Sequence, residues 1–161
     1  MKKIIYTLLI IIALTNNSFS AGTSSDSSDG SSSYTKAKNL IKAAKKYEKK
    51  GEIEKAQKRY AKAQKLLLKS NKKKPLQADT LNYLGFTTRK LGDYKKGEEF
   101  YLQGLQVEPN HNGINEYLGE LYVVTERMDL AKERLEVLKN CNCEEYEELK
   151  EIIVGTKKSK Y

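Results

Sequence analysis

Histidine, cysteine, proline and tryptophan are scarce in this chain of 161 residues, which has one, two, two and none of them, respectively. The lone histidine, His111, leaves a zinc site short of ligands and gives no base beside a nucleophile. The sequence also has no glycine-rich phosphate loop and no metalloprotease helix motif. We therefore expect no catalytic residues, no metal, no cofactor and no enzymatic activity.

The abundant residues favour helices. Lys, Glu, Leu and Ala lose little side-chain freedom in a helix, and only two prolines are present to interrupt one. With 39% hydrophobic and 32% charged residues, the composition is that of a soluble helical protein with room for one domain.

The first twenty residues have the layout of a secretory signal. Two lysines precede an apolar run from Ile4 to Leu14, and small residues follow it. Eleven helical residues span only about 16 Å, short of the roughly 30 Å hydrocarbon core of a membrane. We expect residues 1–20 to be a cleaved signal peptide and the protein to be periplasmic or secreted. Residues 21–35 are serine-rich and are expected to form a flexible leader.

The rest of the chain repeats itself. The triplet at residues 83–85, Tyr-Leu-Gly, recurs 34 residues later at 117–119. An earlier copy fits at an offset of 41 residues, where Ala56 aligns with Gly97 and Tyr60 with Tyr101. Helical periodicity then predicts helices at 36–50, 52–70, 76–91, 94–107, 112–125, 128–140 and 144–154.

Two details of the repeat have a direct physical reading. Small residues such as Gly85 and Gly119 would let paired helices approach closely, while large residues fill the spaces between turns. Gly92 can adopt the left-handed conformation that ends a helix, and Asp93 can cap the next helix. In the third copy Glu126 occupies the position of this turn glycine. If the same left-handed turn forms there, its Cβ clash destabilises the fold by about 1–2 kcal/mol.

These residues resemble the tetratricopeptide repeat, in which an aromatic or large residue precedes Leu-Gly and a proline closes the unit. The middle copy, which closes at Pro109, is nearly complete, whereas the first has Ala43-Ala44 in place of Leu-Gly. The resemblance implies an all-α, right-handed α-solenoid of about three helical hairpins plus a C-terminal capping helix. Its expected parts are a domain over 36–154, with repeats at about 37–70, 78–111 and 112–143 and a cap at 144–154, and a basic tail at 155–161.

A narrower resemblance links residues 78–154 to exported bacterial repeat proteins with a cysteine pair before the last helix. This narrower resemblance implies compartment and architecture but little about activity. The repeat pattern, the export signal and the absence of a reaction centre favour a protein–protein interaction adaptor that binds a protein or peptide in a concave groove. A second copy of the chain is a further candidate partner. The residues expected in the groove are Lys38, Lys45, Asn82, Tyr83, Phe86, Arg89, Lys90, Glu116, Tyr117 and Glu120.

The resemblance does not extend to the set of Lys, Asn and Arg residues with which some repeat proteins hold a terminal carboxylate. Ile41 and Tyr83 occupy two of those places. A clamp for a chaperone tail is therefore not supported.

Positive charge is concentrated in one part of the chain. Residues 34–75 contain sixteen Lys or Arg and three acids, a net charge of +13, whereas residues 76–161 carry −4. One interpretation is a solvated helix surface; the other is a peripheral envelope protein that docks to anionic lipid or wall polymer through this hairpin. Nucleic acid is not an expected partner, because export removes the opportunity to meet it.

Cys141 and Cys143 leave three alternatives open. Export favours a local disulfide, although a ring with one intervening residue is strained. Reduced or intermolecular thiols are the second alternative, and a metal or redox site is the third. His111 is expected to be a solvated turn residue.

Overall fold

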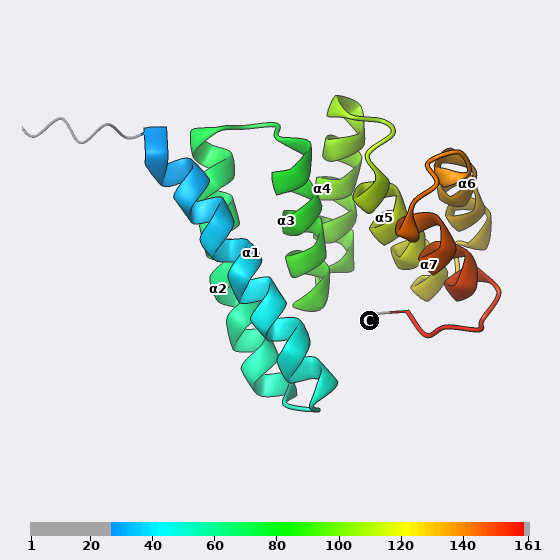
Figure 1. The fold of residues 1–161 in the computed structure, drawn as a ribbon, viewed down its shortest axis with the longest axis horizontal. Coiled ribbons are helices and arrows are strands. Elements are labelled where there is room, and N and C mark those ends of the chain that lie inside the picture. The colour runs from blue at the N-terminus through cyan, green and yellow to red at the C-terminus, as the bar shows by residue number, and fades with distance from the viewer. Residues whose placement is uncertain (1–26, 160–161) are drawn as a thin grey trace, which may run out of the picture.

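The computed structural model describes residues 27–159, and its regular secondary structure over that range consists of helices with no strand, which confirms the all-α prediction (Figure 1). Among these residues, no helix is long and apolar enough to cross a membrane. The seven helices are α1 (Ser27–Lys49), α2 (Ile53–Lys73), α3 (Ala78–Lys90), α4 (Tyr94–Val107), α5 (Asn112–Val124), α6 (Met128–Leu138) and α7 (Glu144–Ile153).

The helices form three hairpins in chain order, α1–α2, α3–α4 and α5–α6, and α7 packs against α5 and α6 (Figure 1). Each hairpin also contacts the next one, through α2 with α3 and α4 with α5. The buried apolar residues fall into two clusters, one between the first two hairpins and one between the second and third. This is the stacking expected of a helical-repeat protein, in which a hairpin buries its apolar face against its neighbours.

The predicted leader needs a correction at its C-terminal end. Residues 27–35 belong to α1, so this helix begins nine residues before the predicted start at residue 36. The physical reason lies where this extension meets the next hairpin: Ser33 is buried, and the ring of Tyr34 packs edge-on against Tyr83 with the ring centres 6.0 Å apart. The predicted signal peptide, the rest of the leader, and residues 160–161 of the tail lie outside the described residues.

The small residues of the repeat lie where large side chains of neighbouring helices need space, as predicted. A Cβ atom on Gly85 would overlap the ring of Tyr101 on α4. A Cβ atom on Gly119 would overlap the side chain of Leu149, so this glycine seats the capping helix α7 on α5. Tyr101 and Leu149 are both fully buried. The two glycines therefore set how closely the helices approach.

We expect Gly85→Ala to lower the free energy of unfolding by about 1–3 kcal/mol, because overpacking of a filled core forces side chains and backbone to shift. Chemical denaturation of the variant would measure this loss. In the double variant Gly85→Ala/Tyr101→Leu, the smaller side chain should reduce the penalty of the added methyl group. Strictly additive losses from the two substitutions would contradict the contact.

The turns within the hairpins share a left-handed residue. Gly51 and Gly92 have φ angles of 73° and 96°, and Glu126 adopts the same conformation with a φ of 60°. The Asp93 side chain accepts a hydrogen bond from the Lys96 backbone N–H at 2.9 Å, which confirms the predicted cap of α4. The third hairpin thus makes the same turn as the others without the residue best suited to it.

Glu126→Gly should raise the free energy of unfolding by about 1 kcal/mol, because glycine adopts a positive φ without a Cβ clash. A matched control is Glu133→Gly within α6, which should lower stability by about 0.5–1 kcal/mol, since glycine there only adds conformational freedom to the unfolded chain. Thermal unfolding of the two variants separates these effects. Destabilisation by both changes would show that the turn tolerates glutamate at no cost.

Candidate binding site

The first helices of the hairpins, α1, α3 and α5, together with α7, make up what we term the inner face. Neighbouring members of this row contact each other in order. Lys45 of α1 reaches across α3: its Nζ lies 4.6 Å from the centre of the Phe86 ring and donates a hydrogen bond to the Tyr117 hydroxyl of α5 at 3.2 Å. A side chain can bridge α1 and α5 only if the row curves inward.

One end of the inner face is basic, aromatic and accessible. Lys38 is exposed, and its Nζ lies 5.5 Å and 5.8 Å from the ring centres of Tyr34 and Tyr83, both of which are half-buried. Lys42 and Lys49 are also exposed and follow Lys38 at helical spacing on the same face of α1. This end, between α1 and α3, can meet an anionic partner without any rearrangement.

The middle of the inner face is buried. Phe86 belongs to the hydrophobic core, with 1% of its surface exposed. The amide nitrogen of Asn82 occupies the space beside Gly113, which has no side chain of its own. Arg89 and Glu120 have fully buried side chains and form an ion pair at 3.5 Å, and Arg89 also donates to the Tyr117 carbonyl. Burial lowers the pKa of the Arg89 guanidinium and raises that of the Tyr117 hydroxyl.

Lys90 is similarly engaged within the protein. Its Nζ lies 2.6 Å from a Glu48 carboxylate oxygen and 5.6 Å from the centre of the Tyr60 ring. The Tyr60 hydroxyl donates to the same carboxylate at 2.8 Å, and burial together with this bond raises the pKa of Tyr60. Lys90 therefore joins α3 to the first hairpin.

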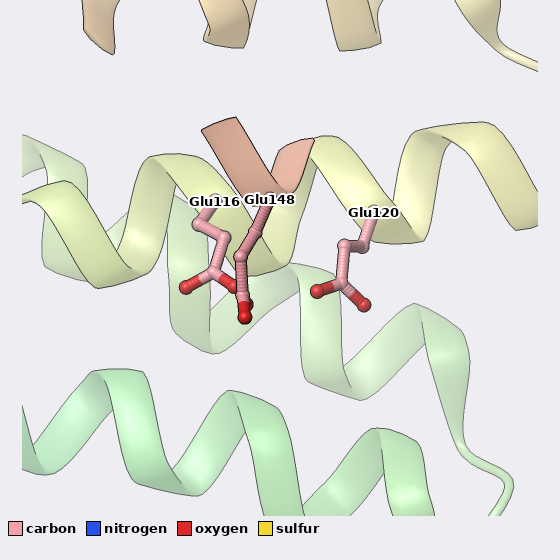
Figure 2. Close-up of side chains that lie close together, drawn as sticks. All are labelled: Glu116, Glu120 and Glu148. Carbon is pink, nitrogen blue, oxygen red and sulfur yellow. The ribbon is translucent and has the colours of Figure 1, made fainter. Parts of the chain in front are cut away.

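Three carboxylates converge at the other end of the inner face. Glu116 and Glu120 of α5 and Glu148 of α7 have oxygens within 4.8 Å of one another (Figure 2). Such a group could hold a divalent cation, but Arg89 contacts Glu120, and the ammonium of Lys157 lies 3.1 Å from Glu148. The carboxylates are thus part of a network that already contains positive side chains.

The C-terminal tail folds back onto this acidic end. Besides Glu148, Lys157 contacts Glu151 at 3.6 Å, and the Ser159 hydroxyl donates to Glu120 at 3.1 Å. Sequence reasoning gave the tail no role in the site. The available signal was charge: a lysine-rich terminus follows the part of the chain with an excess of acids.

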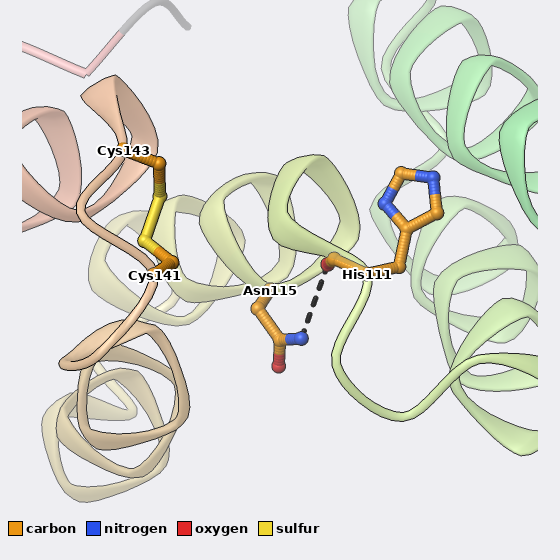
Figure 3. The surroundings of a disulfide bond; sticks show 4 residues. All are labelled: His111, Asn115, Cys141 and Cys143. Carbon is orange, nitrogen blue, oxygen red and sulfur yellow. Dashed lines mark hydrogen bonds between the residues drawn. A yellow bond between two sulfur atoms is a disulfide. The ribbon is translucent and has the colours of Figure 1, made fainter.

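Cys141 and Cys143 are joined by a disulfide bond between α6 and α7. A disulfide sulfur is not the thiolate that binds metal, so the bonded pair offers no metal ligand. His111 is not a solvated turn residue as expected. Its side chain is 13% exposed, its Nδ1 accepts from the Ile114 N–H at the start of α5, and its Nε2 lies 3.3 Å from Asp79. Figure 3 shows its ring turned away from the disulfide.

The arrangement can be compared with known proteins. No protein-family model and no curated protein matches the sequence. Among solved structures, the chain is similar to the first TPR of Spaghetti (RPAP3), which was solved bound to an HSP90 peptide, SRMEEVD. The TM-score is 0.53 at 19% sequence identity, over 76% of this chain and 94% of that one. The chain has a tetratricopeptide-like fold.

In this tetratricopeptide-like fold, the residues predicted to line the groove do come together on the first helices, but their accessibility differs. Lys38 is exposed, and Lys45, Tyr83, Lys90 and Tyr117 are half-buried. The other five are buried: Asn82, Phe86, Arg89, Glu116 and Glu120. Because these five side chains are buried, substituting them with alanine would lower the stability of the fold, and a loss of binding could not be assigned to a lost contact with the partner.

Arg89→Met should lower the free energy of unfolding by about 3–5 kcal/mol, because it leaves the Glu120 carboxylate buried without its cationic partner. The double variant Arg89→Met/Glu120→Met should regain part of that loss, since apolar residues of similar size need no charge compensation. Urea unfolding of the two single variants and the double variant gives the coupling energy. A coupling near zero would show that the pair does not act as a unit.

Proposed function

We propose that this tetratricopeptide-like protein is an exported adaptor that binds an acidic segment of a partner protein on its inner face. The observation that carries the proposal is the accessible row of Lys38, Lys42 and Lys49 on α1, beside the tyrosine pair Tyr34 and Tyr83. Lysine side chains attract carboxylates, and the exposed edges of tyrosines give apolar contact with little loss of side-chain freedom.

The rest of the inner face is not available to a partner, which leaves this end as the binding surface. The middle is filled by core and ion-paired side chains, and the acidic end is covered by the protein's own residues 157–159. The similar domain of RPAP3 carries an acidic peptide, which supports the same class of ligand here. The present site would hold it differently, because Ile41 is buried on α1 and Tyr83 packs against Tyr34.

Export is part of this proposal and follows from the lysine-tipped apolar run at residues 2–14. The disulfide between Cys141 and Cys143 is consistent with an oxidising compartment. Mass spectrometry of the protein recovered from the cell envelope or medium should find a mature N-terminus near Ala21. Recovery with an intact Met1 would argue against cleavage.

Binding is tested with an array of acidic, neutral and basic peptides probed by the wild-type protein and by Lys38→Glu/Lys42→Glu/Lys49→Glu. We expect the variant to lose at least about tenfold in affinity for the acidic peptides, because three attractive charges become repulsive. The matched control is Lys62→Glu/Lys65→Glu/Lys72→Glu on α2, which makes the same change in net charge on another surface. Equal losses in both variants, or no preference for acidic peptides, would refute binding at this end.

A further inference from the structure

Six lysines lie in a single row on the outside of α2, a feature that peptide binding on the inner face does not use. They are three or four residues apart throughout, and all are exposed: Lys55, Lys58, Lys62, Lys65, Lys69 and Lys72. At 1.5 Å per residue the row is about 26 Å long, with about 5 Å between successive lysines. We term these residues the α2 lysine row.

The row points away from the rest of the protein. Ala56, Tyr60, Ala63 and Leu67 are the buried side of α2 and are spaced for the opposite face of the helix. Residues three or four positions apart lie on the same face of a helix, so all six lysines project from the same side of α2. On one flank the row is bordered by the uncharged Gln57, Ala61 and Leu68, and on the other by Arg59, Leu66 and Lys73.

The first two lysines of the row each pair with a glutamate. Lys55 pairs with Glu52, and Lys58 pairs with Glu54 at 2.6 Å, in exposed contacts of the first turns. Within residues 27–159, Lys62, Lys65 and Lys72 have no ion pair. Like charges at this spacing on a helix repel one another, and a bound anion would reduce that repulsion.

A shallow hollow adjoins the first part of the row. It has a volume of about 210 Å³ and is lined by Lys55, Lys58, Arg59 and Lys62 around the ring of Tyr47. The Arg59 guanidinium lies 6.0 Å and the Lys55 Nζ 5.7 Å from the centre of that ring. Two cations held over an aromatic ring and two more beside it form a site where one anionic group can be contacted from several sides.

We propose that the α2 lysine row binds a linear polymer of phosphate groups, with the hollow at Tyr47 holding one of them. The linear arrangement of the lysines is the observation that supports a linear polymer of phosphates. A straight, one-helix-wide row of about 26 Å matches a chain of anions that runs along the helix, whereas a lipid surface would be met better by lysines spread over a plane. A single aromatic ring gives no succession of stacking platforms for the bases of single-stranded nucleic acid.

The test measures binding of long-chain inorganic polyphosphate by the full mature protein over a range of salt concentrations. We expect Lys62→Glu/Lys65→Glu/Lys72→Glu to lose at least about tenfold in affinity and to reduce the slope of log affinity against log salt by about 3, since each phosphate contact contributes about one unit. Lys38→Glu/Lys42→Glu/Lys49→Glu on α1, with the same net charge, should keep affinity within about threefold. Circular dichroism should show that both variants are folded.

Three results would overturn the proposal. Equal losses in the two variants would mean that only net charge matters. Tighter binding to phosphatidylglycerol vesicles than to polyphosphate would assign the row to a membrane surface. Equal binding of oligothymidine would assign it to single-stranded nucleic acid. Because acidic-peptide binding is disrupted by the α1 variant and polyphosphate binding by the α2 variant, failure of one proposal can be told from failure of the other.

Discussion

Close approach of helices at glycine is the constraint on which the other features depend. Gly85 leaves room for the Tyr101 ring, and Gly119 leaves room for Leu149 of the capping helix. With any larger residue at these places the helices would stand further apart. The Tyr101 ring and the Leu149 side chain would be displaced, and with them the positions of α4 against α3 and of α7 against α5. These two glycines therefore determine how the outer helix α4 and the capping helix α7 pack on the helices of the inner face.

This tight packing divides the molecule into structural and accessible regions. In the middle of the inner face, Phe86 and the Arg89–Glu120 pair join the second and third repeats and are removed from solvent. At the α1 end of this face, and on the outside of α2, lysines are exposed to water. We therefore expect binding at the exposed lysines of α1 and α2. The charged side chains in the middle of the inner face are buried and paired with each other.

The sequence predicts the features that arise from local periodicity and fails where distant residues meet. The 34-residue repeat locates the helices, and Gly92 and Asp93 locate a turn and its cap, because each depends only on near neighbours. The Arg89–Glu120 pair joins residues on different repeats, so no spacing within one helix reveals it. The early start of α1 depends likewise on Tyr34 meeting Tyr83, a contact that composition, dominated there by serine, conceals.

The bridge from Lys45 to Tyr117 has a consequence for how the stack comes apart. In an ideal solenoid each repeat touches only the next, so repeats can fray one after another from an end. Here Lys45 of α1 donates a hydrogen bond to the Tyr117 hydroxyl of α5, and Arg89 of α3 donates one to the Tyr117 carbonyl. Loss of the first hairpin would expose groups that hold the third. We therefore expect the first hairpin to be coupled to the third, so that the terminal repeat frays less readily than in an ideal solenoid.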